Sequence, residues 1–302
     1  MKRSSHRLAA LLILVFGSAA CSSPGDNTEA ANIIKFTDDL GRVVELSKRP
    51  ERIISLAPNI TEIVFFLGSG EKLIGVTSYC DWPPQAREIP RVGDFSHPSI
   101  ERIVELSPDL VLTTSHEQDR WIGKLFSLGI PVYSVYPHDC EALLNSMENL
   151  LGLLGDTPAG LDSIRIMAEK LAKLGKTFHL EGNERPGVFI EISKSPLMTA
   201  GSSSFVSDLI ERAGGRNIAS GLPRDYCVIN AERVIKSDPD IVFLFHGLSK
   251  KEELSRRIGW GSIGAVKKGR VYDDIDPDIV LRPGPRAVLG IKEIGERLRE
   301  GN

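Results

Sequence analysis

Blocks of positive charge are absent from this chain of 302 residues, which carries 37 Lys and Arg against 40 Asp and Glu. A nucleic-acid-binding surface needs a stripe of cations that neutralises phosphates, so no nucleic-acid partner is expected. The 41% hydrophobic and 25% charged residues are ordinary for a globular protein, and they exclude disordered, collagen-like and coiled-coil chains. The sequence therefore predicts one or two folded domains with a substantial core.

Long hydrophobic runs are also missing, apart from residues 8–16 behind three N-terminal cations. This run is too short to cross a bilayer and is typical of an export signal, which we assign to residues 1–20. The small residues before Cys21 resemble the lipobox of bacterial lipoproteins, although Ser18 stands where that motif usually has Leu. Residues 21–33 would then be a lipidated N-terminus and a flexible tether. Cleavage by an ordinary signal peptidase is the alternative.

Cysteine is scarce, with four in the whole chain and no CxxC pair or Cys/His cluster at zinc spacing. No metal site is therefore expected. Export leads to an oxidising compartment, and lipidation of Cys21 would leave Cys80, Cys140 and Cys227. An odd number of thiols allows at most one disulfide within the chain.

Signatures of catalysis are missing as well. The sequence has no GxGxxG after a strand, no HExxH and no GxSxG. We therefore expect a protein that is not an enzyme and has no resident cofactor. An exported α/β enzyme remains as an alternative of another class.

What the sequence does contain is an alternation of short apolar segments with helical patterns, which is typical of a parallel sheet wrapped by helices. A hairpin is expected over 34–46, and a capping box formed by Asn59 and Glu62 marks the start of one helix. The other strands are expected at 52–56, 73–77, 109–113, 132–135 and 188–192, and the other helices at 100–106, 120–128 and 205–213.

An internal repeat divides this pattern into two halves. Residues 99–112 (SIERIVELSPDLVL) align with residues 230–243 (NAERVIKSDPDIVF) at a constant offset of 131. A Pro-Asp pair between a helix and a strand is a common connection, but the Glu-Arg pair at the same phase favours duplication. We infer two lobes that share one plan.

A long helical pattern over 159–180 lies between the repeats, without Gly or Pro between Leu161 and Gly175. The predicted fold class is α/β, with two Rossmann-like lobes joined by one long backbone helix and a shallow cleft between them. The predicted boundaries are 34–156 for the first lobe, 157–181 for the helix and 182–302 for the second lobe. Ligands of parallel α/β sheets bind beyond the carboxyl ends of the strands, so those loops should face the cleft.

Aromatic residues gather on these loops. Tyr79 and Trp82 follow a predicted strand, while Phe95 and Tyr226 each precede one of the repeated helices. A single aromatic is more often a core residue, but aromatics at corresponding places in both halves favour a flat ligand that is held from two sides.

Several segments resemble the substrate-binding proteins of ABC importers for cobalamin: YCDWPPQA at 79–86, RVGDF at 91–95, the helix and strand at 100–112, and RPGPR at 282–286. The resemblance extends over about residues 52–298. It implies the class III periplasmic binding protein fold in a monomer outside the cytoplasmic membrane, with cobalamin as transported ligand rather than cofactor. The wider family also binds ferric siderophores and haem, which stay as alternatives.

The resemblance also implies roles for individual residues. Glu101 and Glu232 match the glutamates that dock on the permease dimer, although an acid early in a helix also favours the helix dipole. Phe95 and Tyr226 stand where a well-known member has tryptophans. The implied ligand-binding residues are Tyr79, Trp82, Phe95, Met198, Tyr226, Asp278 and Arg282.

Overall fold

The computed structural model describes residues 33–114, 118–180, 184–247 and 250–300. The predicted signal sequence, Cys21 and nearly all of the tether lie outside these ranges. In the described part of the chain, no helix is both long and apolar enough to span a bilayer.

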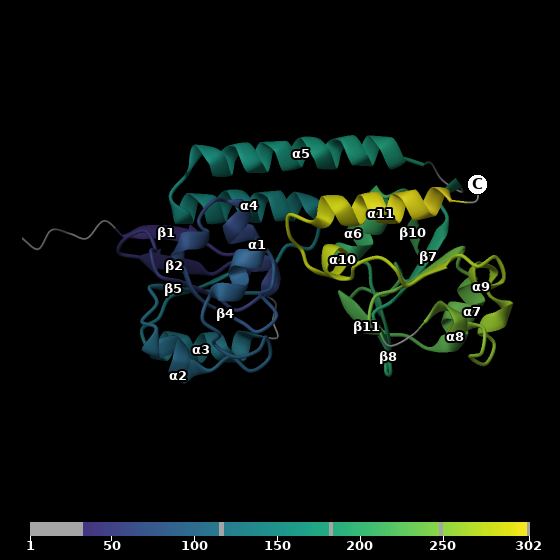
Figure 1. Cartoon of the computed structure of the whole chain (residues 1–302), viewed down its shortest axis with the longest axis horizontal. Helices are drawn as coiled ribbons and strands as arrows, with labels where there is room; N and C mark the ends of the chain where they lie inside the picture. The colour runs from purple at the N-terminus through teal and green to yellow at the C-terminus, as the bar shows by residue number, and fades with distance from the viewer. Residues whose placement is uncertain (1–32, 115–117, 181–183, 248–249, 301–302) are drawn as a thin grey trace, which may run out of the picture. The chain divides into compact units, whose positions relative to one another are not determined.

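Two four-stranded parallel sheets form the centres of two lobes (Figure 1). In chain order, each sheet places its second strand at one edge, followed by the first, third and fourth strands. This shared topology agrees with the predicted duplication, and the α/β fold class is confirmed. The first sheet has the order β4 (Leu73–Val76), β3 (Ile53–Ser55), β5 (Leu110–Thr113) and β6 (Val132–Ser134), and the second has β10 (Arg216–Asn217), β7 (Gly187–Glu191), β12 (Ile241–Leu244) and β13 (Val271–Tyr272).

Helices bury these strands, and β3, β5, β7 and β12 are buried along their whole lengths. Such strands read as continuous Val, Ile and Leu runs because neither face of the sheet meets water. The first lobe has α1 (Pro58–Phe66), α2 (Ile100–Glu105), α3 (Asp119–Ser127) and α4 (Cys140–Leu154). The second lobe has α6 (Phe205–Arg212), α7 (Ala231–Ser237), α8 (Lys251–Leu254), α9 (Gly264–Lys267), α10 (Asp278–Leu281) and α11 (Ala287–Arg299).

The repeated segment makes the same contacts in both lobes. Ser99 and Asn230 cap α2 and α7 by accepting a hydrogen bond from the backbone N–H three residues later. Asp109 accepts hydrogen bonds from the backbone N–H groups of residues 51 and 52, both at 2.9 Å, immediately before β3. Asp240 accepts one at 2.7 Å from Gly187, the first residue of β7. The repeated aspartate therefore ties each third strand to the start of the first.

The predicted backbone helix is present as α5 (Pro158–Phe178), but it does not brace the lobes alone. It packs against α4 of the first lobe and α11 of the second, and Figure 1 shows α5 running along both. Helices α4 and α11 were not predicted from the sequence. In α11 the reason is visible: Gly290 and Gly295 lower helix propensity, yet a Cβ there would lie 2.5 Å from the Ile279 carbonyl and 2.6 Å from the Phe178 ring.

Two antiparallel pieces complete the fold. The predicted hairpin is β1 (Ile34–Thr37) paired with β2 (Val43–Leu46), with Gly41 at φ 77° in its turn. The second piece was not predicted: β8 (Ser193–Lys194), β9 (Leu197–Ala200) and β11 (Tyr226–Val228) form a small sheet. Tyr226, expected on a loop, therefore lies on a strand. Because Val228 pairs with Met198 and side chains alternate along a strand, Tyr226 and Met198 share one face.

Candidate functional site

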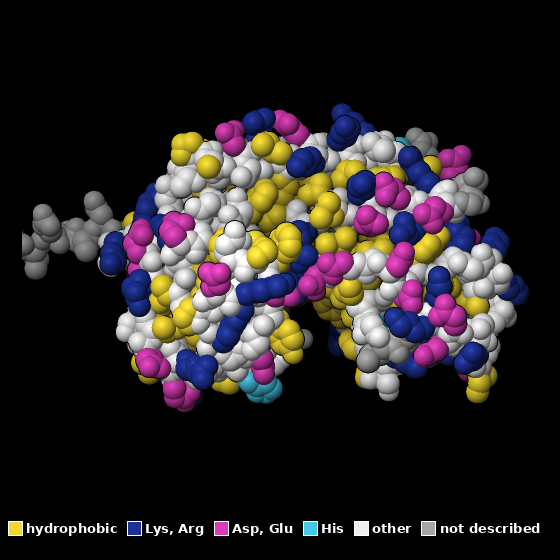
Figure 2. Space-filling view, in the orientation of Figure 1, with side chains coloured by type: hydrophobic (Ala, Val, Ile, Leu, Met, Phe, Trp, Pro, Cys, Tyr) yellow, Lys and Arg dark blue, Asp and Glu magenta, His cyan; other side chains and the backbone are white. Residues whose placement is uncertain are grey.

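A cavity of about 660 Å³ lies between the two lobes. Its residues in the first lobe follow strands β3, β5 and β6 or belong to the loop after β4, as expected for the carboxyl ends of parallel strands. The space-filling view shows this face of the protein hollowed between the lobes (Figure 2). The lining residues are Pro58, Asn59, Phe95, Thr114 and Tyr136 from the first lobe, and Met198, Arg224, Asp225, Tyr226, Leu281, Arg282 and Pro283 from the second.

Four of the predicted ligand-binding residues meet at this cavity: Phe95, Met198, Tyr226 and Arg282. Phe95 belongs to the first lobe, is partly buried, and packs against a hydrophobic core cluster with residues of both lobes. Tyr226 and Met198 come from the small sheet of the second lobe, and Tyr226 is 41% exposed. The cavity thus has an aromatic side chain on each side.

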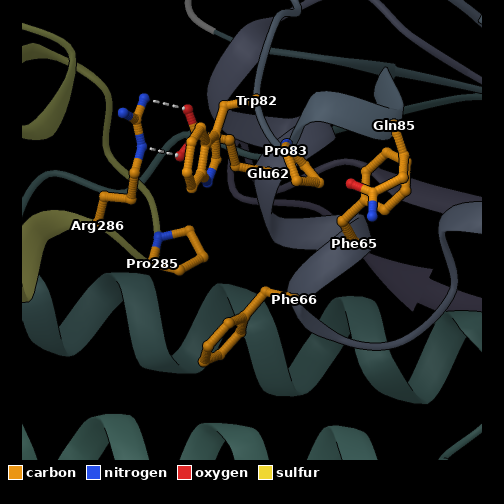
Figure 3. Close-up of a pocket in the computed structure, with 8 residues that line it drawn as sticks. All are labelled: Glu62, Phe65, Phe66, Trp82, Pro83, Gln85, Pro285 and Arg286. Carbon is orange, nitrogen blue, oxygen red and sulfur yellow. Dashed lines mark hydrogen bonds and ion pairs between the residues drawn. The ribbon is translucent and has the colours of Figure 1, made fainter. Parts of the chain in front are cut away.

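The other three predicted residues do not line this cavity. Tyr79 is 62% exposed on the loop after β4. Trp82 lines a smaller pocket of about 370 Å³ together with Phe65, Phe66 and Arg286. In Figure 3 the Trp82 ring stands beside Arg286, whose guanidinium lies 5.2 Å from the ring centre. Asp278 forms an ion pair with a residue of the lining, since its carboxylate lies 2.8 Å from the Arg282 guanidinium.

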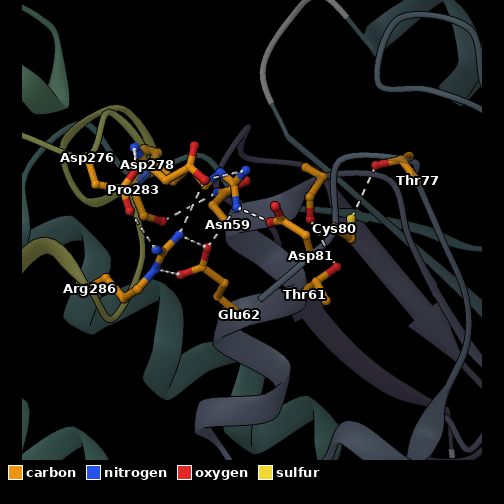
Figure 4. A network of polar contacts seen from close by, with 12 residues as sticks. Asn59, Thr61, Glu62, Thr77, Cys80, Asp81, Asp276, Asp278, Pro283 and Arg286 are labelled. Atoms are coloured by element: carbon orange, nitrogen blue, oxygen red, sulfur yellow. Dashed lines mark hydrogen bonds and ion pairs between the residues drawn. The ribbon is translucent and has the colours of Figure 1, made fainter. Parts of the chain in front are cut away.

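The lobes are joined next to the cavity by a network of charges that starts at Glu62 of α1 (Figure 4). Glu62 is only 3% exposed. Arg286 donates two hydrogen bonds to its carboxylate at 2.7 and 2.9 Å, and Arg282 donates one at 3.3 Å. Arg282 also donates to Asp81 at 2.9 Å. Arg282 therefore lines the cavity while its charge is compensated by carboxylates of both lobes.

The predicted capping box at Asn59 and Glu62 is wrong. Helix α1 begins after Ala57 and has no side-chain cap. The Asn59 amide instead donates to the carbonyl of Pro283 at 3.4 Å, and Glu62 binds the two arginines. Both polar residues of α1 that looked like local signals serve contacts with the second lobe.

Burial and the neighbouring arginines have opposite effects on the pKa values of the carboxyl groups in this network. Burial raises the pKa of Glu62, although Arg286 and Arg282 oppose the shift. Burial also raises the pKa of Asp278, with Arg282 opposing it. Burial alone would raise the pKa of Asp81, but the hydrogen bond and charge of Arg282 hold that pKa below its ordinary value.

Tyr136, Arg224 and Asp225 were not predicted. The Tyr136 hydroxyl donates a hydrogen bond to the Asp225 carboxylate, so these two cavity residues also join the lobes. Tyr136 follows β6, and the rule about strand ends could have singled it out. Asp225 could not be recognised from the sequence, because its role depends on a residue 89 positions away.

Glu101 and Glu232 occupy equivalent places outside the cavity. Each is exposed in the first turn of its helix, α2 or α7. Backbone and Ser99 hydrogen bonds hold the pKa of Glu101 below its ordinary value. Both carboxylates are therefore accessible to a partner.

Three of the four cysteines lie in the described part of the chain. Cys80, Cys140 and Cys227 are buried and unpaired by disulfides. In the described ranges, no group of three or more His, Cys, Asp or Glu residues could hold a metal ion.

Comparisons with known proteins agree on the architecture. A sequence model described as "Periplasmic binding protein" matches residues 53–277. YvrC of Bacillus subtilis strain 168, named as an uncharacterized ABC transporter substrate-binding lipoprotein, is 30% identical over 313 residues, covering 99% of this chain and 98% of the relative.

Two solved structures carry different ligand descriptions. The periplasmic vitamin B12 binding protein BtuF of Vibrio cholerae has a TM-score of 0.72 and 26% identity, covering 83% of this chain and 97% of that one. A possible iron-binding periplasmic protein of Staphylococcus epidermidis has a TM-score of 0.73 and 26% identity, covering 84% and 100%.

Proposed function

Because the chain belongs to the periplasmic binding protein family and is the substrate-binding protein of an ABC transporter, we propose that it captures cobalamin or a related corrinoid. The ligand would occupy the cavity between the lobes and then pass to the permease. The protein binds a solute and is not an enzyme, and it acts on the outer side of the cytoplasmic membrane.

The observation that carries the proposal is the pair of aromatic side chains, Phe95 and Tyr226, on opposite sides of one cavity. Covering roughly 300 Å² of apolar ligand surface would contribute about 7 kcal/mol. Association costs at least about 4 kcal/mol, so one aromatic wall would not suffice. A tyrosine also offers a hydroxyl to the polar rim of a ligand while its ring covers a flat face.

The charges around the cavity support a ligand with little net charge. Arg282 is held by Asp278 and Asp81, at 2.8 and 2.9 Å, and by Glu62. Asp225 adds a negative charge to the lining. A cavity designed for a polyanion would present several uncompensated cations instead.

One observation favours a second candidate, a ferric siderophore or haem. Arg224 lines the cavity, is exposed, and forms no ion pair with any other described residue. An anionic iron chelate could use this cation. The similarity to the possible iron-binding protein of Staphylococcus epidermidis supports the same alternative.

The ligand is tested by titrating the purified protein with cyanocobalamin, haem and a ferric siderophore, with intrinsic fluorescence as the signal. We expect saturable binding of cyanocobalamin at micromolar concentration or below. Phe95→Ala combined with Tyr226→Ala should weaken it at least about tenfold, because both walls are lost. Trp82→Ala removes a ring that faces the other pocket and should have a smaller effect. Saturable binding of only an iron chelate would refute the corrinoid.

Glu101 and Glu232 are proposed to dock on the permease. Exposed ion pairs contribute about 0 to 1 kcal/mol each, so their value would be orientation. Two equal charges at equivalent places on two lobes fit a two-fold partner in one geometry.

The docking role predicts that Glu101→Lys with Glu232→Lys abolishes corrinoid uptake by cells and leaves the affinity for the ligand unchanged. Reversing two exposed acids of α5, Asp162 and Glu169, is the matched control and should leave uptake intact. Loss of ligand affinity in the Glu101/Glu232 variant would remove the docking role.

Membrane attachment is proposed at Cys21, outside the described residues. Its test is metabolic labelling with a fatty acid. Labelled protein is expected, and Cys21→Ala should remain unlabelled.

A further inference from the structure

Tyr136 and Asp225 come from different lobes and meet at the cavity. Both line it, and the Tyr136 hydroxyl donates a hydrogen bond to Oδ2 of Asp225. The pair thus presents one donor and one ionisable acceptor to the same space. A ligand that enters between the lobes at this point must replace that hydrogen bond.

Each member is held by its own lobe, so the pair has a defined geometry. The backbone N–H of Tyr136 donates to Asp39 at 2.7 Å, and the Tyr136 ring packs edge-on against His138 with centres 4.7 Å apart. The Asp225 carbonyl accepts from the backbone N–H of Gly201 at 2.9 Å. Loss of the bond between the two side chains would leave both residues anchored.

We infer that this pair recognises a primary carboxamide of the ligand and discriminates against a carboxylate at the same position. The inference rests on the proposed function. A carboxamide is complementary to both partners: its carbonyl oxygen accepts from the Tyr136 hydroxyl, and its NH₂ donates to the Asp225 carboxylate. A carboxylate can accept from Tyr136, but it has no hydrogen to donate and meets the like charge of Asp225.

This chemistry separates the candidate ligands. The corrin ring of cobalamin carries amide side chains at its rim, whereas haem carries carboxylates. Arg224, next to Asp225 in the chain, would attract a carboxylate and act in the opposite direction. Arg224 is exposed and its charge is screened by water, while Asp225 is partly buried, so the carboxylate of Asp225 has the larger influence at the pair.

The test uses cyanocobalamin and the monocarboxylic acids made from it by hydrolysing one peripheral carboxamide. The unaltered protein should bind at least one of these acids about tenfold or more weakly than cyanocobalamin. Asp225→Asn removes the charge but keeps the size, and its own NH₂ can donate to a carboxylate. It should bring the affinities for that acid and for cyanocobalamin to within about twofold of each other.

Three further variants complete the experiment. Tyr136→Phe removes the hydroxyl and should weaken the binding of cyanocobalamin and of the acid by a similar factor. Arg224→Gln should weaken the binding of the acid and leave the binding of cyanocobalamin unchanged. Asp276→Asn is the control, because Asp276 lies 3.5 Å from Arg286 and does not line the cavity. In this variant, the ratio of the affinity for cyanocobalamin to the affinity for the acid should be the same as in the unaltered protein.

The outcomes separate this inference from the proposed function. If cyanocobalamin binds but no acid is disfavoured, or if Asp225→Asn leaves the ratio of amide to acid unchanged, the inference is overturned and the corrinoid function stands. If the unaltered protein does not bind cyanocobalamin at all, the proposed function is overturned and the inference with it.

Discussion

Among single residues, the Glu62 carboxylate depends strongly on partners, because a buried charge is costly unless other groups compensate it. It is almost fully buried, and two arginines of the other lobe supply its hydrogen bonds. Removing one partner of a buried ion pair costs more than the pair contributes, because the remaining charge stays away from water. Arg286 carries most of this compensation, since it binds both carboxylate oxygens.

Arg286→Gln should therefore destabilise the protein by about 3 kcal/mol near neutral pH. The pKa of Glu62 is already raised by burial, and losing Arg286 would raise it further. A raised carboxyl pKa means that the folded state binds the proton more tightly than the unfolded state. Stability then falls as pH rises from the ordinary carboxyl pKa through the raised one, so the loss should be smaller at about pH 5 than at about pH 8.

Urea unfolding at the two pH values measures both effects. The control is Arg165→Gln, which removes exposed pairs with Asp162 and Glu169 and should cost less than about 1 kcal/mol at either pH. A loss for Arg286→Gln that is equally small, or that grows toward acid pH, would contradict this description of Glu62.

At the scale of elements, the repeated Pro-Asp aspartates explain why the duplication was visible in the sequence. Asp109 and Asp240 bind backbone N–H groups at the start of the neighbouring strand, and that role needs a carboxylate at a fixed distance from the strand. Because this requirement is local, the same residue type occurs at the equivalent position of both lobes.

Asp109→Ala and Asp240→Ala should each destabilise the protein by about 1.5 kcal/mol, because backbone donors lose a charged acceptor. Asp109→Asn keeps an acceptor and should recover part of the loss. Thermal unfolding gives the comparison, with Glu45→Gln on the exposed face of β2 as a variant that should change little. If both alanine variants unfold at the same midpoint temperature as the unaltered protein, the two repeated aspartates do not stabilise the fold.

Elements that depend on distant partners were harder to predict. Helix α11 was missed because Gly290 and Gly295 make it a poor helix in isolation, and only its packing shows why glycine is needed there. The capping box at Asn59 and Glu62 failed for a related reason. The spacing is right for a local cap, but both side chains have partners more than two hundred residues away in the chain.

At the scale of the whole molecule, the sequence predicted the two lobes, the linking helix and the position of the cavity from patterns within each half. It could not predict which side chains meet between the halves. The contacts of Tyr136 with Asp225 and of Glu62 with Arg286 depend on the tertiary arrangement alone. Phe95 and Tyr226, which precede equivalent helices, both line the cavity, whereas Trp82, which was singled out because it follows a predicted strand, lines a different pocket.

The bracing of the lobes follows from the same arrangement. Helix α5 packs on α4 and on α11, and polar contacts of Glu62 and Tyr136 cross from the first lobe to the second. A ligand that displaces Arg282 or Asp225 from these contacts acts on the junction of the lobes directly. If the ligand binds as proposed, its capture would therefore act on the same residues that join the lobes.

The most direct test of the central claim is a crystal structure of the protein with cyanocobalamin. The corrin ring should lie between the side chains of Phe95 and Tyr226, with Arg282 at its rim. A corrin bound against Trp82 in the smaller pocket, or outside the space between the lobes, would contradict the proposal that Phe95 and Tyr226 hold the ligand.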